Sequence, residues 1–147
     1  MTTIAYRDGV MAGDGRETCQ NDDNASYAVL QDDCVKVYKI NGKLFGAAHS
    51  SEDIERLYRR LMKVNAKKKK VRIKCEDIFA MLVDKKGRIW VYEGRIWQRM
   101  PKPYFSVGSG SVFALAAMDA GATAEEAVKI AKGRDPFSGG LVTTVKL

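Results

Sequence analysis

The chain has 147 residues, of which 46% are hydrophobic and 29% charged, and its formal net charge is +7. This balance suits one globular domain over residues 1–147, and no apolar run reaches the roughly 20 residues of a membrane span. Three cysteines without CxxC or zinc spacing, and a single histidine, His49, weigh against a metal site, and no cofactor is expected. The odd cysteine count and the absence of a secretory signal pattern predict a cytoplasmic protein.

The first predicted elements are two hairpins. The segment TTIAYRDGVMAGDG contains two short strands around an Asp8–Gly9 turn, a strong hairpin signal. The polar stretch 16–24 is expected to be a loop. A second hairpin, in VKVYKINGKLFGAAH, is expected to turn at Asn41–Gly42. A helix should follow, because apolar residues recur at helical spacing from Ile54 to Met62.

The second half of the chain predicts strands, then two helices, then a strand. Two strands, in DIFAMLVD and RIWVYEG, lie around a Lys-Lys-Gly turn, and YFSV follows after two prolines. One helix is expected from Ser111 to Gly121, and a second begins at the capping box Thr123–Glu126. The last strand is LVTTVKL. Antiparallel hairpins with helices grouped between them predict an α+β fold.

Much of the positive charge lies in one stretch, AKKKKVRIK at residues 66–74. It can be a solvated loop, or it can contact an anionic partner such as nucleic acid. No aromatic residue is interleaved to stack on bases, which weighs against nucleic acid as a partner.

Thr2 is the first candidate for chemistry. If Met1 is removed, Thr2 carries both a hydroxyl and a free α-amine, whose unperturbed pKa of about 7.7–8.0 lets it accept a proton at neutral pH. A nucleophile with its own base needs no histidine. The alternative is that Thr2 simply begins a strand.

Other residues add to this interpretation. Asp14 follows a strand in AGDG, and Lys36 lies on the strand VKVYK, where a lysine ordinarily faces solvent. A lysine near Thr2 would lower the pKa of its hydroxyl and amine. Ser109 lies in the glycine-rich VGSGS. Asp135 and Ser138 lie in GRDPFSGG, between the last helix and the last strand.

Five segments in this order resemble the proteasome β-subunits and bacterial HslV. These are TTI at 2–4, AGDG at 12–15, VKV at 35–37, GSGS at 108–111 and RDPFSGG at 134–140. Each is weak alone, but together they span almost the whole chain. The resemblance implies a four-layer αββα sandwich of antiparallel sheets, the N-terminal nucleophile hydrolase fold, and threonine peptidase activity.

The resemblance also implies roles for individual residues. Thr2 would be the nucleophile, supported by the Asp14–Lys36 ion pair, and Gly46 would supply the oxyanion-hole N–H. Residues that orient the α-amine and a catalytic water would be Ser109, Asp135 and Ser138.

The substrate pocket follows from the same resemblance. Family positions that line it fall on Cys34, Tyr38, Leu44, Ala48 and the Glu17–Thr18 edge, with Thr18 and Ala48 pairing with an extended peptide backbone. Leu44 and Ala48 would favour apolar or aromatic side chains before the cut. The alternative for all of these residues is core packing. For His49, which falls where HslV has a glycine, a surface or packing role is expected.

The chain also departs from the family pattern. It is short between the first helix and DIFAMLVD, so one helical layer should be reduced, and it stops without the family's last strand. A homo-oligomer, as a ring or stacked rings, is still expected. Its substrates would be unfolded polypeptides, and an ATP-dependent unfoldase would be a partner. The competing hypothesis is a non-catalytic ring or scaffold subunit, which retention of Met1 would favour.

Overall fold

The computed structural model describes residues 2–20, 27–48, 54, 56, 59, 78–93 and 96–147. The predictions about Met1, His49 and the basic stretch 66–74 therefore concern residues outside those described. Among those described, the elements in chain order are β1 (Thr3–Arg7), β2 (Val10–Gly13), β3 (Glu17–Gln20), β4 (Tyr27–Gln31), β5 (Val37–Ile40), β6 (Lys43–Ala48), β7 (Phe79–Val83), β8 (Ile89–Glu93), β9 (Ile96–Met100), β10 (Tyr104–Gly108), α2 (Ser111–Asp119), α3 (Ala124–Lys132) and β11 (Thr143–Lys146).

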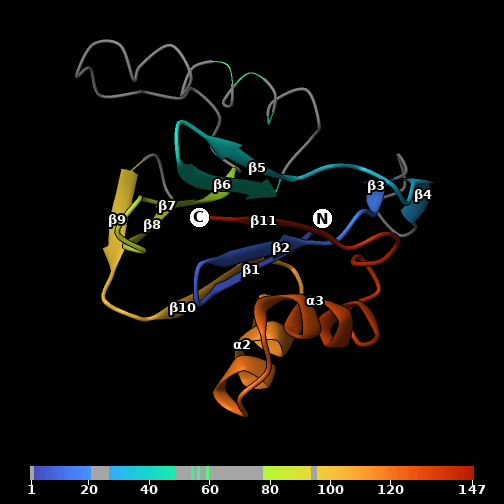
Figure 1. The fold of residues 1–147 in the computed structure, drawn as a ribbon. Coiled ribbons are helices and arrows are strands. Elements are labelled where there is room, and N and C mark those ends of the chain that lie inside the picture. The colour runs from blue at the N-terminus through green and yellow to red at the C-terminus, as the bar shows by residue number, and fades with distance from the viewer. Residues whose placement is uncertain are drawn as a thin grey trace.

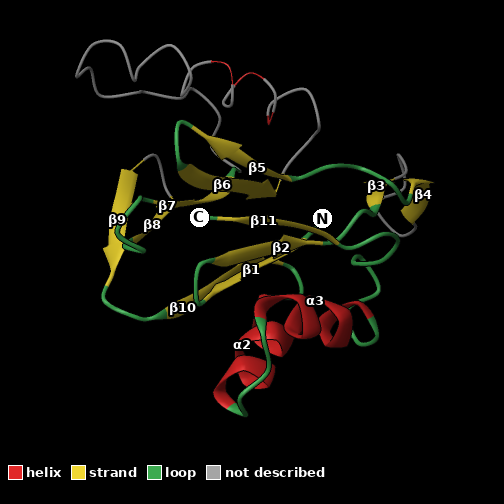
Figure 2. Cartoon of the chain, in the orientation of Figure 1, coloured by secondary structure: helices red, strands yellow, loops and turns green. Residues whose placement is uncertain are grey.

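The strands form two stacked sheets and one ribbon, and every pairing is antiparallel. The first sheet has the order β10-β1-β2-β11, the second has the order β5-β6-β7-β8-β9, and β3 and β4 form a separate ribbon. Figure 1 shows the two sheets face to face, with α2 and α3 beneath the first sheet. The C-terminal strand β11 runs beside β2, at the edge of that sheet (Figure 2).

Alternation along β1 explains this layering. Ile4 and Tyr6 enter the core between the sheets, whereas Ala5, on the opposite face, packs under the helices with Ala12. Period-2 alternation of buried residues on both faces is what a central strand covered on both sides requires. The start of β1, where Thr2 lies, is thereby fixed between two packed layers.

The local signals in the sequence are confirmed. Asp8 and Asn41 have φ values of 48° and 50° and are followed by glycines at 80° and 75°, as two-residue hairpin turns require. Thr123 caps α3 with its capping box complete. Of the helix expected over residues 54–62, the structure describes Ile54, Arg56 and Arg59, and Ile54 is buried.

Two expectations about strands were wrong. The stretch 16–24 is not simply a loop, because Glu17–Gln20 forms β3 and pairs with β4, and β9 was not predicted at all. The residues of β3 are mostly polar, and β9 is an edge strand with exposed residues. Neither strand shows the hydrophobic alternation by which strands are recognised.

The α+β class is confirmed, with three layers of the expected sandwich seen in the described residues: helices, first sheet and second sheet. Of the second helical layer, expected to be reduced, the structure describes residues 54, 56 and 59. Within the described part, no helix has the length and apolar character needed to cross a membrane.

Candidate active site

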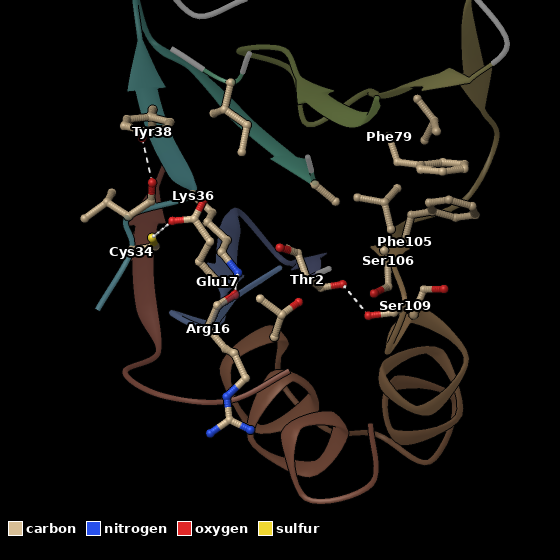
Figure 3. Close-up of a pocket in the computed structure, with 18 of the residues that line it drawn as sticks. Thr2, Arg16, Glu17, Cys34, Lys36, Tyr38, Phe79, Phe105, Ser106 and Ser109 are labelled. Carbon is tan, nitrogen blue, oxygen red and sulfur yellow. Dashed lines mark hydrogen bonds between the residues drawn. The ribbon is translucent and has the colours of Figure 1, made fainter. Parts of the chain in front are cut away.

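Thr2 lies in the wall of a large cavity, immediately before β1. The cavity has a volume of about 1210 Å³, and its lining includes Thr2, Arg16, Lys36 and Ser109. Thr2 itself is only 1% exposed. Figure 3 shows Lys36 on one side of Thr2 and Ser109 on the other. The structure thus brings three predicted site residues from distant parts of the chain to one place.

A buried ion pair lies next to Thr2. The Lys36 ammonium is 3.3 Å from Asp14 Oδ1, and the two side chains are 5% and 0% exposed. The Asp14 carboxylate also accepts hydrogen bonds from the backbone N–H groups of Thr3 (2.8 Å), Gly139 (2.9 Å) and Arg16 (3.2 Å). Lys36 Nζ donates a further hydrogen bond to the Arg16 carbonyl. Because each charge has a partner and further hydrogen bonds, the pair can remain buried.

Burial has a definite effect on Lys36. Desolvation lowers the pKa of the Lys36 ammonium below its ordinary value, and the nearby Asp14 carboxylate opposes that shift. Lys36 is therefore a cation whose charge depends on Asp14. A cation in this position favours the neutral form of an amine at Thr2 and the ionised form of the Thr2 hydroxyl.

A chain of hydroxyl groups connects Asp135 to the start of β1. The Ser138 hydroxyl donates to Asp135 Oδ2 at 2.5 Å, and Thr3 Oγ1 lies 2.6 Å from Ser138 Oγ. The Ser109 hydroxyl lies 2.7 Å from the same Asp135 oxygen and 3.4 Å from the Thr2 carbonyl oxygen. The predicted trio of Ser109, Asp135 and Ser138 is therefore assembled, and it contacts both threonines.

Two glycines of VGSGS allow this close approach. Gly108 has φ +98°, and a Cβ there would lie 1.9 Å from the Thr2 carbonyl oxygen. A Cβ at Gly110 would lie 2.0 Å from Thr3 Oγ1. The glycines are needed because the backbone passes directly against the Thr2–Thr3 segment.

Sequence reasoning missed Thr3. Its side chain, not that of Thr2, receives the contact from Ser138, and its N–H binds Asp14. The available signal was a polar residue at the start of a strand that is otherwise buried, where a hydroxyl needs a hydrogen-bond partner.

The predicted substrate-pocket residues divide into two groups. Thr18, Cys34, Tyr38 and Ala48 line the cavity, as expected of substrate contacts. Leu44 is not in the lining: it is fully buried in the core between the sheets, as the alternative of core packing expects.

Gly46 is not brought to the cavity either. It lies inside β6, paired with Val37 and Met81, and a Cβ there would meet Ile4 at 2.9 Å. Leu44, Gly46 and Ala48 share one face of β6, but successive residues advance about 3.3 Å along a strand. Only Ala48, at the end of the strand, reaches the cavity.

The wall around Cys34 is polar. The Cys34 thiol is 3.2 Å from Glu17 Oε2, and the Gln31 amide donates to that same carboxylate oxygen at 2.7 Å. Cys34 and Cys19 are free thiols. Among the residues that the structure describes, no group of three or more His, Cys, Asp or Glu side chains could hold a metal ion.

Comparison by sequence finds no relative: no family model matches the chain, and no curated protein is similar to it. Comparison by structure does find similar folds. Eukaryotic HslV from Trypanosoma brucei superposes with a TM-score of 0.70 and 17% identity, covering 99% of each chain. BPH from Thiobacillus denitrificans in complex with Epoxomicin superposes with a TM-score of 0.65 and 16% identity, covering 99% of this chain and 97% of that one. The structure of BPH alone superposes with a TM-score of 0.61 and 17% identity, covering 99% of this chain and 96% of that one.

These alignments run over nearly the full length of both chains. At 16–17% identity, the similarity establishes the fold alone. The chain has the HslV-like, proteasome-like fold that its five short segments indicated.

Proposed function

We propose that this protein is a threonine-type peptidase whose nucleophile is Thr2, made active by removal of Met1. The observation that carries the proposal is the buried Asp14–Lys36 pair, whose lysine lines one cavity with Thr2. A buried ion pair adds little to stability by itself, and a buried lysine whose pKa is lowered beside a cavity is a feature of reaction sites.

The proposed reaction uses only groups of Thr2, the substrate and water. The Thr2 α-amine accepts the hydroxyl proton as Oγ attacks the carbonyl carbon of the scissile peptide bond. The tetrahedral intermediate collapses, the C–N bond breaks, and the leaving nitrogen takes the proton from the α-amine. An acyl ester on Thr2 remains, and water, deprotonated by the same amine, hydrolyses it.

The surrounding residues act by position and charge. The Lys36 ammonium stabilises negative charge on Oγ as the proton leaves. Ser109 and the Thr3–Ser138 pair connect the Thr2 segment to Asp135, which fixes the segment's orientation. Holding nucleophile and base in one geometry is a major part of such a rate enhancement.

The proposal extends to the assembly. The HslV-like fold supports a homo-oligomeric ring or stacked rings that act on unfolded polypeptides, with an ATP-dependent unfoldase as partner. The competing function is a non-catalytic ring subunit with the same fold.

Intact-mass measurement and hydrolysis of a fluorogenic peptide test the proposal together. The purified protein should lack one methionine mass and cleave the peptide. Thr2→Ala should abolish cleavage without unfolding the protein, and Thr2→Ser should keep part of it, since hydroxyl and amine both remain. Thr144→Ala, at an exposed threonine of β11, is the matched control. Equal activity of Met1-free wild type and Thr2→Ala would reject the peptidase, and a retained Met1 without activity would favour the ring subunit.

A further inference from the structure

One large apolar side chain of the second sheet, Phe79, faces inward but is not fully covered. Phe79, Met81 and Val83 share one face of β7, because alternate residues of a strand point the same way. Met81 and Val83 are fully buried in the core between the sheets, whereas Phe79 is 42% exposed. The core therefore ends before Phe79 and leaves a large aromatic ring facing the cavity.

The opposite side of this opening is also apolar. Phe105 and Met100 are only partly buried against the core between the sheets, and both line the cavity. Together these residues form what we call the apolar pocket, whose members are Phe79, Val91, Met100, Phe105 and Leu115. Exposed Glu93 is the charged side chain in this part of the lining.

Thr2 separates the apolar pocket from a wall of different chemistry. Figure 3 shows Phe79 and Phe105 on one side of Thr2, and Glu17, Cys34 and Tyr38 on the other. On that second side Glu17 is hydrogen-bonded to Cys34, so the wall presents a carboxylate and a thiol. The lining also includes exposed Leu30 and Val35, the chain neighbours of Gln31 and Cys34, so this wall mixes polar and apolar groups, whereas the side of Phe79 and Phe105 is mainly apolar.

We propose that the apolar pocket binds an aromatic or bulky aliphatic side chain of the substrate, at the residue that follows the scissile bond. This inference rests on the proposed peptidase function. The resemblance assigns the wall of Cys34 and Tyr38 to the residue before the cut, so the chain beyond the cut continues toward Phe79 and Phe105. Covering these exposed rings with an apolar side chain removes apolar surface from water, which is favourable.

Cleavage of a peptide library reads this specificity directly. The new N-termini, identified by mass spectrometry, should be enriched in Phe, Leu and Met. A peptide with Phe after the cut should have a kcat/KM about tenfold or more above its Ala counterpart, the discrimination that apolar pockets reach. Phe79→Ala should remove this preference by lowering kcat/KM for the Phe peptide to near that of its Ala counterpart.

The matched control is Phe113→Ala. Phe113 is 38% exposed, close to the 42% of Phe79, but it lies on α2 and does not line the cavity. Phe113→Ala should keep the preference. Equal effects of the two substitutions, or a preference located only before the cut, would overturn the proposal.

A binding measurement separates the pocket from the peptidase reaction. In the Thr2→Ala protein with ¹³C-methyl methionine, N-acetyl-phenylalanine amide should shift the Met100 signal saturably, and N-acetyl-lysine amide should not. Met118, a buried residue of α2 that packs in the core between the helices and the first sheet, is the internal reference. No shift at Met100 would overturn the pocket whatever the hydrolysis result. A shift combined with absent hydrolysis in wild type would reject the peptidase and, with it, the substrate assignment.

Discussion

Asp14→Asn tests whether the buried ion pair is what holds the site together. The substitution keeps the size and shape of the side chain and removes its charge, so Lys36 loses its anionic partner in a place where its side chain is 5% exposed. The amide creates a second conflict. One carboxylate oxygen accepts from Thr3 N–H and Lys36, and the other accepts from the N–H groups of Arg16 and Gly139. Either orientation of the amide therefore points an NH₂ group at a donor.

The expected loss of stability is large. Removing one partner of a buried pair costs about 3–5 kcal/mol. For a chain of this size about 3 °C of melting temperature is lost per kcal/mol, so Asp14→Asn should melt about 9–15 °C below wild type. Thermal unfolding followed by circular dichroism measures this, and urea unfolding gives the free energy separately.

Two controls make the result specific. Asp8→Asn changes an ion pair whose aspartate side chain is 83% exposed, and it should stay within about 0.5 kcal/mol of wild type. Asp14→Asn combined with Lys36→Met should recover part of the loss, because the unpaired charge is removed. If Asp14→Asn melts within 1 °C or so of wild type, or if the second substitution makes it worse, the buried pair does not have the role given to it here.

Further predictions concern Lys36, Gly108 and assembly. Lys36→Ala should lower the rate of peptide hydrolysis at least tenfold, because a charge near Thr2 shifts the pKa of Thr2 by about 1–3 units. Lys39→Ala, at an exposed lysine, should leave the rate unchanged. Equal losses in the two variants would contradict the role of Lys36. The pKa of Lys36 is lowered in the folded state, so between that pKa and 10.5 the unfolded chain binds more protons than the folded one. The free energy of unfolding of wild type should therefore rise, relative to that of Lys36→Met, as the pH rises through this window. Gly108→Ala should destabilise the protein more than Gly121→Ala does. Both glycines have φ near 100°, but only a Cβ at Gly108 meets the Thr2 carbonyl. Similar urea midpoints for the two variants would refute this. Light scattering should show at least six chains per particle, and a strict monomer at micromolar concentration would count against a ring.

The parts of the fold that could be predicted are those encoded locally. The Asp8–Gly9 and Asn41–Gly42 turns need positive φ, and the residue pairs that tolerate it are visible in the sequence. The capping box at Thr123 is likewise a pattern within four residues. By contrast, β3 was missed because a two-stranded ribbon outside the main sheets needs no hydrophobic alternation.

For the site, the residue types and their order in the sequence indicated which residues belong to it. They did not indicate where each side chain points in the folded chain. The contacts among Thr3, Asp14 and Lys36 join three separate segments, all of which resemble HslV, but the resemblance indicated a role only for Asp14 and Lys36. Leu44 and Gly46 do not line the cavity, because how far along β6 the cavity extends is decided by register and packing. The uncovered ring of Phe79 depends on where two sheets stop touching, a property of the assembled layers.

The hydrogen bond between Thr3 and Ser138 joins residues 135 positions apart in the chain. During synthesis, the first of these residues leaves the ribosome long before the second is made. Thr2 is then without the contacts from Ser109 and the Asp135 segment that orient it, and the Asp14 carboxylate lacks the N–H of Gly139. A nascent or truncated chain that ends before residue 134 should therefore carry the reactive threonine without the arrangement that activates it, so the order of synthesis delays activity until nearly the whole chain has folded.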